Sequence, residues 1–318
     1  MEPVLQLQDL SVHYKAGRHS VHALEDVDLD VNLGETVGVV GETGCGKSTL
    51  GKAVLGLFPP GTKTSGRVVF RGQDLLGKDD AELHEIRGKE IALIFQDPMT
   101  RLNPLMTIEE HFVEMVLAHE DIPEAEALRR SRIALMSMGI PESRMRNHPH
   151  EFSGGMRQRI MIALALVLRP SLLVADEPTT SLDVIVEAQI LEILEDLKEA
   201  YKMSLLLITH NLGIVAETCD RVAVLYAGKL VELGPVRDIF ARPVHPYTRG
   251  LLSSIIHLDT RELYSVEGMP PDLRDPPSGC RFHPRCPHAQ AICAEREPLL
   301  EEFRPGQFAA CHFGKDFL

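Results

Sequence analysis

The 318-residue chain lacks any uninterrupted apolar run of the roughly 20 residues that a membrane-spanning helix needs. Its longest apolar run, from Ile160 to Leu168, stops at Arg169-Pro170. The opening residues, Met1-Glu2-Pro3, do not begin a basic and then apolar secretion signal. We therefore expect a protein that does not itself span a membrane and that works in the cytoplasm.

Positive charge is also scarce. Lys and Arg number 33 against 46 Asp and Glu, which gives a formal net charge of −13. Because nucleic-acid backbones attract surplus Lys and Arg, this balance argues against a nucleic-acid partner. The 44% hydrophobic and 25% charged content is that of an ordinary globular protein. The length suits one full-size core with a smaller appendage.

The first 95 residues show strand patterns around one helix. Residues 4–7 and 23–31 alternate apolar with polar side chains, which is typical of half-buried strands. Thr36 to Val40 is a short β-branched run that indicates a buried parallel strand. Residues 48–57 read as a helix that ends before Phe58-Pro59-Pro60-Gly61. A glycine-rich loop therefore lies between a strand and a helix.

This loop, Gly41 to Ser48, fits the pattern G-x-x-x-x-G-K-[ST] of a phosphate loop. Its glycines let the backbone N–H groups surround a phosphate, Lys47 reaches the β- and γ-phosphates, and the Ser48 hydroxyl binds Mg²⁺. Thr49 offers a further hydroxyl. The residues predicted to bind ATP here are Gly41, Glu42, Thr43, Gly44, Cys45, Gly46, Lys47, Ser48 and Thr49.

An apolar strand from Leu172 ends in two carboxylates, Asp176 and Glu177. We expect Asp176 to hold the Mg²⁺ shell and Glu177 to act as the general base toward the attacking water. The alternative for this pair is a solvated acidic strand end.

A third segment, Glu151 to Arg159, precedes that strand and contains Ser153, Gly154 and Gly155. A Ser-Gly-Gly turn that opens a helix presents a hydroxyl and bare N–H groups at the positive end of the helix dipole, which is an anion site. Residues 107–110 form a capping box, and 125–138 read as a further helix. The apolar residues that share one face of the first helix are Ile108, Phe112, Met115 and Val116.

In this order, the phosphate loop, the Ser-Gly-Gly turn and the acidic strand end resemble the ATP-binding cassette (ABC) family. The resemblance implies that Ser153, Gly154 and Gly155 grip the γ-phosphate of an ATP held by another subunit. ATP would then join two cassettes. Residues 178–183, with Asp183, match the loop that crosses the dimer interface in this family.

Three single residues take roles only through this resemblance. Gln96 corresponds to the glutamine that touches Mg²⁺ and reports to the transmembrane partner, and His210 to the switch histidine at the γ-phosphate. Tyr14 corresponds to the aromatic residue that stacks on adenine. Taken alone, Gln96 is typical of a surface residue and His210 of a structural histidine, and the alternative for Tyr14 is a core tyrosine.

From about Gly234 the chain is irregular and rich in proline, which favours extended chain over helix. The proline-rich stretches are 242–252, 267–271 and 276–280. Together with residues 281–287 and 310–312, they resemble the C-terminal extension of ATPase subunits of the oligopeptide and dipeptide permease family.

The resemblance implies an α/β fold, with a RecA-like core, antiparallel β-strands and a helical lobe. The cassette would span residues 1–235, with the lobe at about 98–160, and residues 236–318 would form a regulatory or iron–sulfur extension. The implied function is ATP hydrolysis that drives import of a solute, expected to be di- or oligopeptides, with metals or sugars as alternatives.

One phosphate loop and one Ser-Gly-Gly turn are present, so two cassettes must pair. The implied partners are a sister ATPase or a second copy of the chain, two transmembrane permease subunits, and an extracellular or periplasmic solute-binding protein. The chain would then sit at the cytoplasmic face of the membrane.

Two other classes of ABC protein remain as alternatives. A soluble ABC ATPase that acts on ribosomes or DNA predicts tandem cassettes, a basic surface or a coiled-coil insert, and the sequence shows none of these. A nucleotide-gated regulator without hydrolysis would be expected to lack Glu177 or His210, and both are present.

Four of the six cysteines, Cys280, Cys286, Cys293 and Cys311, follow the spacing C-x5-C-x6-C-x17-C in a tail with few core residues. Such a tail needs support other than apolar burial. Disulfides are disfavoured in the cytoplasm. Zinc suits four thiolates, but its sites usually contain close C-x2-4-C pairs. We predict one [4Fe–4S] cluster, as the family resemblance implies, with zinc and unligated thiols as alternatives.

The two other cysteines stand outside this group. Cys45 lies beside a helix N-terminus, which favours a reactive thiolate if the thiol is exposed. The alternative is an inert side chain in place of the serine that is commoner in the family. Cys219 is predicted to be a buried helix residue.

Overall fold

The computed structural model describes residues 3–95, 101–179, 183–254 and 266–318. The chain forms two compact units, one from Met1–Gly77 with Leu207–Leu318 and the other from Lys78–Leu206. We call them unit 1 and unit 2. The chain therefore leaves unit 1 after Gly77 and returns to it at Leu207.

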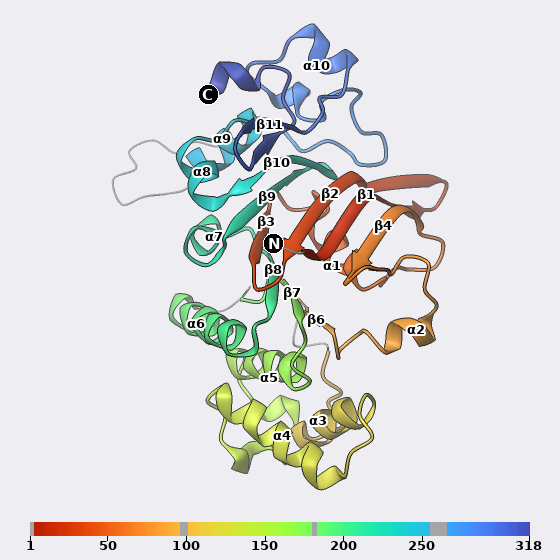
Figure 1. Ribbon diagram of the computed structural model, residues 1–318, viewed down its shortest axis with the longest axis vertical. Coiled ribbons are helices and arrows are strands. Elements are labelled where there is room, and N and C mark those ends of the chain that lie inside the picture. Colours follow the sequence, from red (N-terminus) through yellow and green to blue (C-terminus); the bar gives the residue numbers. More distant parts are fainter. Residues whose placement is uncertain (1–2, 96–100, 180–182, 255–265) are drawn as a thin grey trace. The chain divides into compact units, whose positions relative to one another are not determined.

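Unit 1 begins with an antiparallel sheet in the order β2-β1-β4-β5, of which Figure 1 labels β2, β1 and β4. Its strands are β1 (Pro3–Ala16), β2 (His19–Asn32), β4 (Lys63–Phe70) and β5 (Gln73–Asp74). The alternating apolar residues point into the core, and Leu5, Leu24 and Val27 are fully buried. The first two strands extend beyond the predicted segments because pairing between them continues to Ala16, which lies opposite His19.

A second sheet of unit 1 starts from the predicted buried strand. β3 (Thr36–Val40) runs parallel to β9 (Arg221–Tyr226), and β10 (Lys229–Pro235) is antiparallel to β9. The C-terminal strands β12 (Gln307–Ala309) and β11 (Glu301–Arg304) follow next to β10. β8 (Ser204–Ile208) crosses the boundary between the units. The extension therefore adds strands to the sheet that carries β3.

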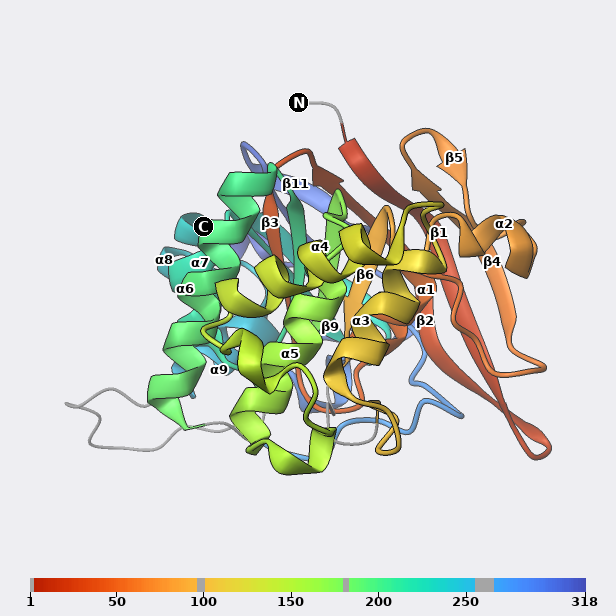
Figure 2. The ribbon, with the colours of Figure 1, turned by 90° about the horizontal axis from the view of Figure 1, so that it is seen from below.

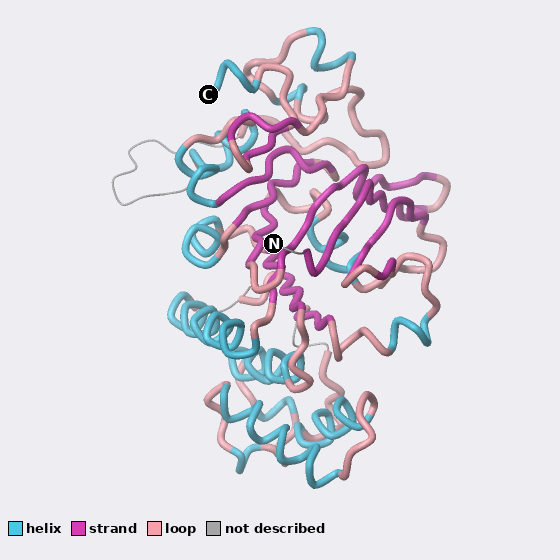
Figure 3. The backbone as a smooth tube through the Cα atoms, in the orientation of Figure 1, coloured by secondary structure: helices cyan, strands magenta, loops and turns pink. Residues whose placement is uncertain are grey.

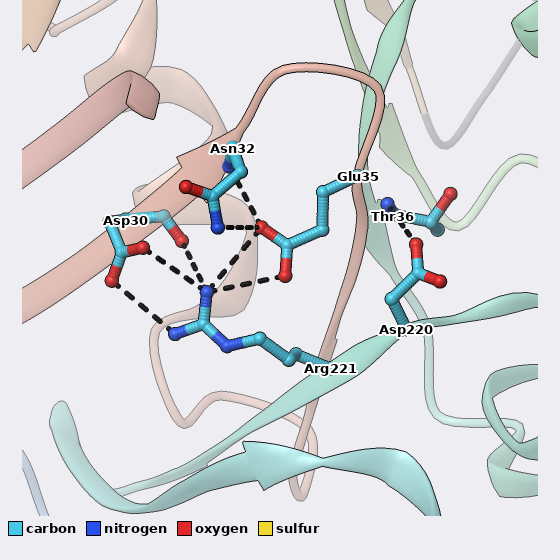
Figure 4. A network of polar contacts seen from close by, with 6 residues as sticks. All are labelled: Asp30, Asn32, Glu35, Thr36, Asp220 and Arg221. Carbon is cyan, nitrogen blue, oxygen red and sulfur yellow. Dashed lines mark hydrogen bonds and ion pairs between the residues drawn. The ribbon is translucent and has the colours of Figure 1, made fainter. Parts of the chain in front are cut away.

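A polar network fastens β2 to β9 next to β3 (Figure 4). Arg221 donates to the Asp30 carboxylate at 3.2 and 3.3 Å and to the Glu35 carboxylate at 3.3 and 3.4 Å. Beside it, the Thr36 N–H donates to Asp220 Oδ2 at 2.8 Å. These contacts fix the point at which β3 begins, and hence the strand that leads into the phosphate loop.

The helices of unit 1 are α1 (Lys47–Val54), α7 (Leu212–Thr218), α8 (Val236–Ala241), α9 (Pro246–Ser253) and α10 (Ala291–Glu295). The prediction of extended chain at 242–252 is wrong, because α9 occupies more than half of that segment. Pro246 takes the first helical position, where an N–H is not required, and His245 Nδ1 accepts the Tyr247 N–H at 3.1 Å. Cys219 is not a helix residue either, since it is half-buried at the position that ends α7.

Beyond α9 the described chain consists mostly of loops and turns (Figure 3). It also contains two short 3₁₀ turns, at His283–Arg285 and Gly314–Phe317. Phe282 is buried against Tyr226 and Tyr247, with ring centroids 5.1 and 5.4 Å apart. An aromatic cluster therefore joins the extension to β9 and α9.

Unit 2 contains two parallel strands, β6 (Ile91–Ile94) and β7 (Leu172–Asp176), and the main helical elements of the chain. Its helices are α2 (Asp80–His84), α3 (Ile108–Leu117), α4 (Glu124–Ser137), α5 (Gly154–Leu166) and α6 (Val184–Tyr201), with 3₁₀ turns at Glu142–Arg144 and Pro149–Glu151. Helices α3, α4 and α5 pack together (Figure 2).

The predicted capping box at the start of α3 is confirmed. The Thr107 N–H donates to Glu110 Oε2 at 2.7 Å, and the Glu110 N–H donates to Thr107 Oγ1 at 3.3 Å. The apolar face behind it is buried at Ile108, Phe112 and Val116. No helix in the described part of the chain is both long enough and apolar enough to cross a membrane.

Candidate nucleotide-binding site and cysteine cluster

The phosphate loop lies in unit 1, between the buried end of β3 and the first turn of α1. Two of its glycines are required by their surroundings. A Cβ at Gly41 would lie 2.2 Å from the Leu225 carbonyl oxygen, and one at Gly46 would lie 2.4 Å from the Ala23 carbonyl oxygen. Both also have a positive φ, of 150° and 109°. The phosphate loop therefore lies close to the backbone at Leu225 on one side and at Ala23 on the other.

Lys47 is the first residue of α1 and is buried. Its Nζ donates to the carbonyl oxygens of Gly41 at 2.8 Å and Glu42 at 3.0 Å. An ammonium group has three N–H bonds, so a third can be donated to a phosphate oxygen. Ser48 and Thr49 follow in the same helical turn, where the helix dipole favours an anion.

The structure contradicts the expectation of a reactive Cys45. Its side chain is only 4% exposed, and burial raises the pKa of the thiol despite the charge of Lys47. Its sulfur lies 2.7 Å from the position that a Cβ at Gly41 would take, so it fills the inside of the loop. Cys45 is therefore an inert packing residue, as the alternative to a reactive thiolate predicts.

Two further predicted residues belong to unit 1 as well. The Thr209 N–H donates to the Val39 carbonyl oxygen at 3.2 Å, so His210 follows a strand end that pairs with β3 just before the phosphate loop. Tyr14 lies on β1, half-buried, opposite Val21 of β2. Unit 1 thus holds the phosphate loop, His210 and Tyr14.

The acidic strand end and the Ser-Gly-Gly turn lie in unit 2. Asp176 is the buried last residue of β7, and Glu177 follows with a left-handed φ of 48°. Ser153 caps α5, because its hydroxyl accepts the Met156 N–H at 3.4 Å. The Gln158 amide of α5 donates to the Pro178 carbonyl oxygen. This bond links the helix behind the turn to the loop that follows Glu177.

Ser153 and Gly154 are exposed and Gly155 is half-buried, so the start of α5 is open to solvent in this chain. Asp183 caps α6, and its carboxylate accepts the Val186 N–H at 2.9 Å. Gln96 lies outside the described residues.

The four predicted ligand cysteines come together in the extension. Cys280, Cys286, Cys293 and Cys311 line one pocket, with Phe282 and Phe313 among the other lining residues. Burial raises the pKa of Cys280 to about 12 and that of Cys311 to about 11.

Sequence patterns did not indicate two arginines of the extension with buried side chains, of which Arg285 contacts the phosphate loop. Arg281 and Arg285 come from the segment between Cys280 and Cys286 and are 7% and 6% exposed. Arg285 pairs with Glu42 of the phosphate loop, and Arg281 pairs with Glu25 of β2. No local signal predicts these contacts, since 243 residues separate Arg285 from Glu42.

Glu25 also belongs to a group with His13 and His22, whose candidate ligand atoms all lie within 4.8 Å of one another. Arg281 already supplies a positive charge to Glu25. This pairing disfavours a metal ion at these three residues.

Comparison with known protein families covers most of the chain. The sequence model of the ABC transporter family matches residues 24–180. The model described as the oligopeptide/dipeptide transporter C-terminal region matches residues 231–293.

Curated relatives match over nearly the full length. The oligopeptide transport ATP-binding protein OppD of Salmonella typhimurium is 46% identical over 312 residues, which cover 97% of this chain and 93% of OppD. The dipeptide transport ATP-binding protein DppD of Bacillus subtilis is 47% identical over 300 residues, which cover 92% of this chain and 89% of DppD.

Solved structures show the same cassette fold. The dimeric post-hydrolysis state of the ATP-binding cassette MJ0796, bound to ADP and Pi, matches with a TM-score of 0.67 and 28% identity over 73% of this chain and 99% of that chain. The structure of cbiO1 from Clostridium perfringens matches with a TM-score of 0.65 and 28% identity over 76% and 92%. The α/β cassette prediction is therefore confirmed. The chain belongs to the ATP-binding proteins of the oligopeptide/dipeptide ABC transporters and is an ATP-hydrolysing subunit of that family.

Proposed function

We propose that this chain drives the import of di- or oligopeptides by hydrolysing ATP between two paired cassettes. The observation that carries the proposal is that the chain has two helix N-termini suited to phosphate. One is α1, behind the phosphate loop, and the other is α5, behind the exposed Ser153 and Gly154. Each cassette would hold ATP on α1 and offer α5 to the ATP of its partner.

The proposed roles of the residues follow their chemistry. Glu177 accepts a proton from the attacking water, while Lys47 and His210 contact the γ-phosphate. Mg²⁺ would be held by the Ser48 hydroxyl, Asp176 and Gln96. Ser48 lies in the first turn of α1 behind glycine-rich backbone, and Asp176 is a buried carboxylate at a strand end, which suits a hard cation with oxygen ligands. Tyr14 would stack on adenine, and Asp183 would lie at the interface of the pair.

The proposed partners are a sister ATPase or a second copy of the chain, two transmembrane permease subunits, and an external solute-binding protein. The similarity to the oligopeptide transport protein OppD and the dipeptide transport protein DppD supports peptides over metals or sugars as the solute. The chain would act at the cytoplasmic face of the membrane. We place the cassette at residues 1–235 and the extension at 236–318.

The experiment that tests this function is Glu177→Gln. The amide keeps the shape of the side chain but cannot accept the proton, so hydrolysis should fall by roughly 10² to 10⁴-fold while MgATP affinity stays unchanged. The variant should also accumulate as an ATP-bound pair of cassettes in size-exclusion chromatography. Glu195→Gln on the exposed face of α6 is the matched control. Wild-type turnover in Glu177→Gln would rule out the role of this glutamate.

We also propose that Cys280, Cys286, Cys293 and Cys311 bind one [4Fe–4S] cluster. A single zinc ion with bonds of about 2.3 Å would require four sulfurs about 3.8 Å apart. The wide loops between these four cysteines suit a cluster better than one zinc ion, because each thiolate of a cluster binds a different iron. When bound, the cluster would supply the cross-link that holds this loop-rich segment together.

Protein purified without oxygen should be brown and contain about four iron and about four sulfide per chain. Cys286→Ser should lose both the colour and the iron, whereas Cys219→Ser should keep them. One zinc per chain without iron would replace the cluster by a zinc site at the same four residues.

A further inference from the structure

Arg285 is held by all of its N–H groups. The guanidinium donates to Glu42 Oε2 at 2.8 Å, to Glu42 Oε1 at 3.0 Å and to the Tyr226 hydroxyl at 3.2 Å. Its other two N–H groups donate to the carbonyl oxygens of Glu267 at 2.8 Å and Val266 at 3.1 Å. Five donors thus meet five acceptor contacts, an arrangement that only the planar fork of an arginine can make.

Glu42, the second residue of the phosphate loop, is fixed at three points. Its carboxylate takes the two bonds from Arg285, and its N–H donates to the Tyr247 hydroxyl at 2.9 Å. Its carbonyl oxygen accepts from Lys47 at 3.0 Å. Burial raises the pKa of Tyr247, which keeps the hydroxyl neutral near Glu42. Arg285 and Tyr247 of α9, both in the extension, therefore contact the loop that would bind the phosphates.

The charge of Glu42 matters at this position. A carboxylate in a loop that binds a polyanion repels the anion, and in a partly buried site that repulsion is weakly screened. A bidentate guanidinium neutralises this charge and keeps the carboxylate on the side of the loop that faces Tyr226 and residues 266–267.

We infer that Arg285 is a positioning residue for ATP binding, by which the cysteine-containing extension clamps the phosphate loop through Glu42. Arg281 anchors the same segment, since it donates to Glu25 and to the Ala227 carbonyl oxygen. Both arginines lie between Cys280 and Cys286, so the clamp starts at the proposed cluster. The inference rests on the proposed function, because it assumes that the loop binds ATP.

The test measures MgATP affinity by titration of the full-length protein with a fluorescent ATP analogue. Arg285→Gln should raise the Kd roughly tenfold, since it removes a charge-assisted pair and leaves the Glu42 charge in place. Arg285→Gln with Glu42→Gln should return the Kd to within about threefold of wild type, because no charge is left to neutralise. The kcat of Arg285→Gln, which is the rate at saturating ATP, should change by a smaller factor than its KM for ATP.

Arg274→Gln is the matched control, because it breaks an exposed pair with Asp272 in the same extension. Its Kd should equal that of wild type. If Arg285→Gln does not fold, Arg285→Lys keeps the charge, loses the fork and should show an intermediate Kd.

A wild-type Kd in Arg285→Gln would overturn the inference. So would a double variant that binds MgATP as weakly as Arg285→Gln alone. Either result leaves the function standing, whereas normal turnover of Glu177→Gln would count against the function alone.

Discussion

At the scale of single residues, burial decides the chemistry of Cys45. A helix N-terminus and a nearby lysine both favour a thiolate, and Lys47 does lower the pKa of this thiol. Desolvation is the larger effect, because the side chain is packed under Gly41 with 4% exposure. The charged form is therefore disfavoured, although the neighbouring residues suggest the opposite.

We accordingly expect Cys45 to resist alkylation in the folded protein. Because burial raises its pKa above the ordinary thiol value, little thiolate exists at neutral pH, and the rate of alkylation should increase with pH until the pH reaches that raised pKa. The measurement is peptide mass spectrometry after iodoacetamide treatment at pH 7 and pH 9, with denatured protein as the reference. Modification at pH 7 as fast as in the denatured chain would show that the thiol is accessible.

At the scale of elements, the cysteine segment depends on one glycine. Gly279 has a φ of 65°, and a Cβ there would lie 2.4 Å from the Cys293 carbonyl oxygen. The same oxygen accepts the Cys280 N–H at 2.8 Å. The turn before Cys280 and the end of α10 therefore approach too closely for any side chain.

Gly279→Ala should separate Cys280 from Cys293 and lower the free energy of unfolding. The loss should exceed the roughly 1–2 kcal/mol that a left-handed φ alone costs. Gly306→Ala in the turn between β11 and β12 is the control, since its φ of 74° is similar but the nearest atom to a Cβ is 3.9 Å away. Denaturant unfolding and metal content of both variants give the comparison. Equal losses in the two variants would mean that the close approach is unimportant.

At the scale of the whole molecule, the proposed ATP site is shared between chains, and Gly154 offers a test of this sharing. A Cβ at Gly154 meets nothing within 4 Å of the described residues. An acidic side chain is also favourable in the first turn of a helix. A substitution there should therefore leave the single chain intact.

Gly154→Asp should bind MgATP as wild type does but hydrolyse it roughly a hundredfold more slowly, because the new carboxylate would face the phosphates of the partner's ATP. Gly77→Asp, also exposed and with open space at its Cβ, is the control. Nucleotide titration and phosphate release measure the two properties. Normal hydrolysis by Gly154→Asp would argue against a site completed by a second cassette.

Local patterns in the sequence determined the elements whose cause is itself local. The β-branched run at Thr36–Val40, the capping box at Thr107 and the glycine pattern from Gly41 each predict their structure from a few neighbouring residues. The family resemblance rests on the order of such short motifs along the chain, and each motif is itself a local pattern. Helix α9 also has a local cause, but the prolines of its segment predict extended chain, whereas Pro246 occupies the first helical position.

Only the tertiary structure decided what depends on residues far apart in the chain. The raised pKa of Cys45 follows from burial, and the Arg285–Glu42 pair joins residues 243 positions apart. Short-range patterns carry no information about such contacts, because these contacts arise when the segment that carries Phe282 folds back on Tyr226 of β9 and Tyr247 of α9. The sequence thus determined the cassette and its candidate chemistry, while folding determined that the extension holds the phosphate loop.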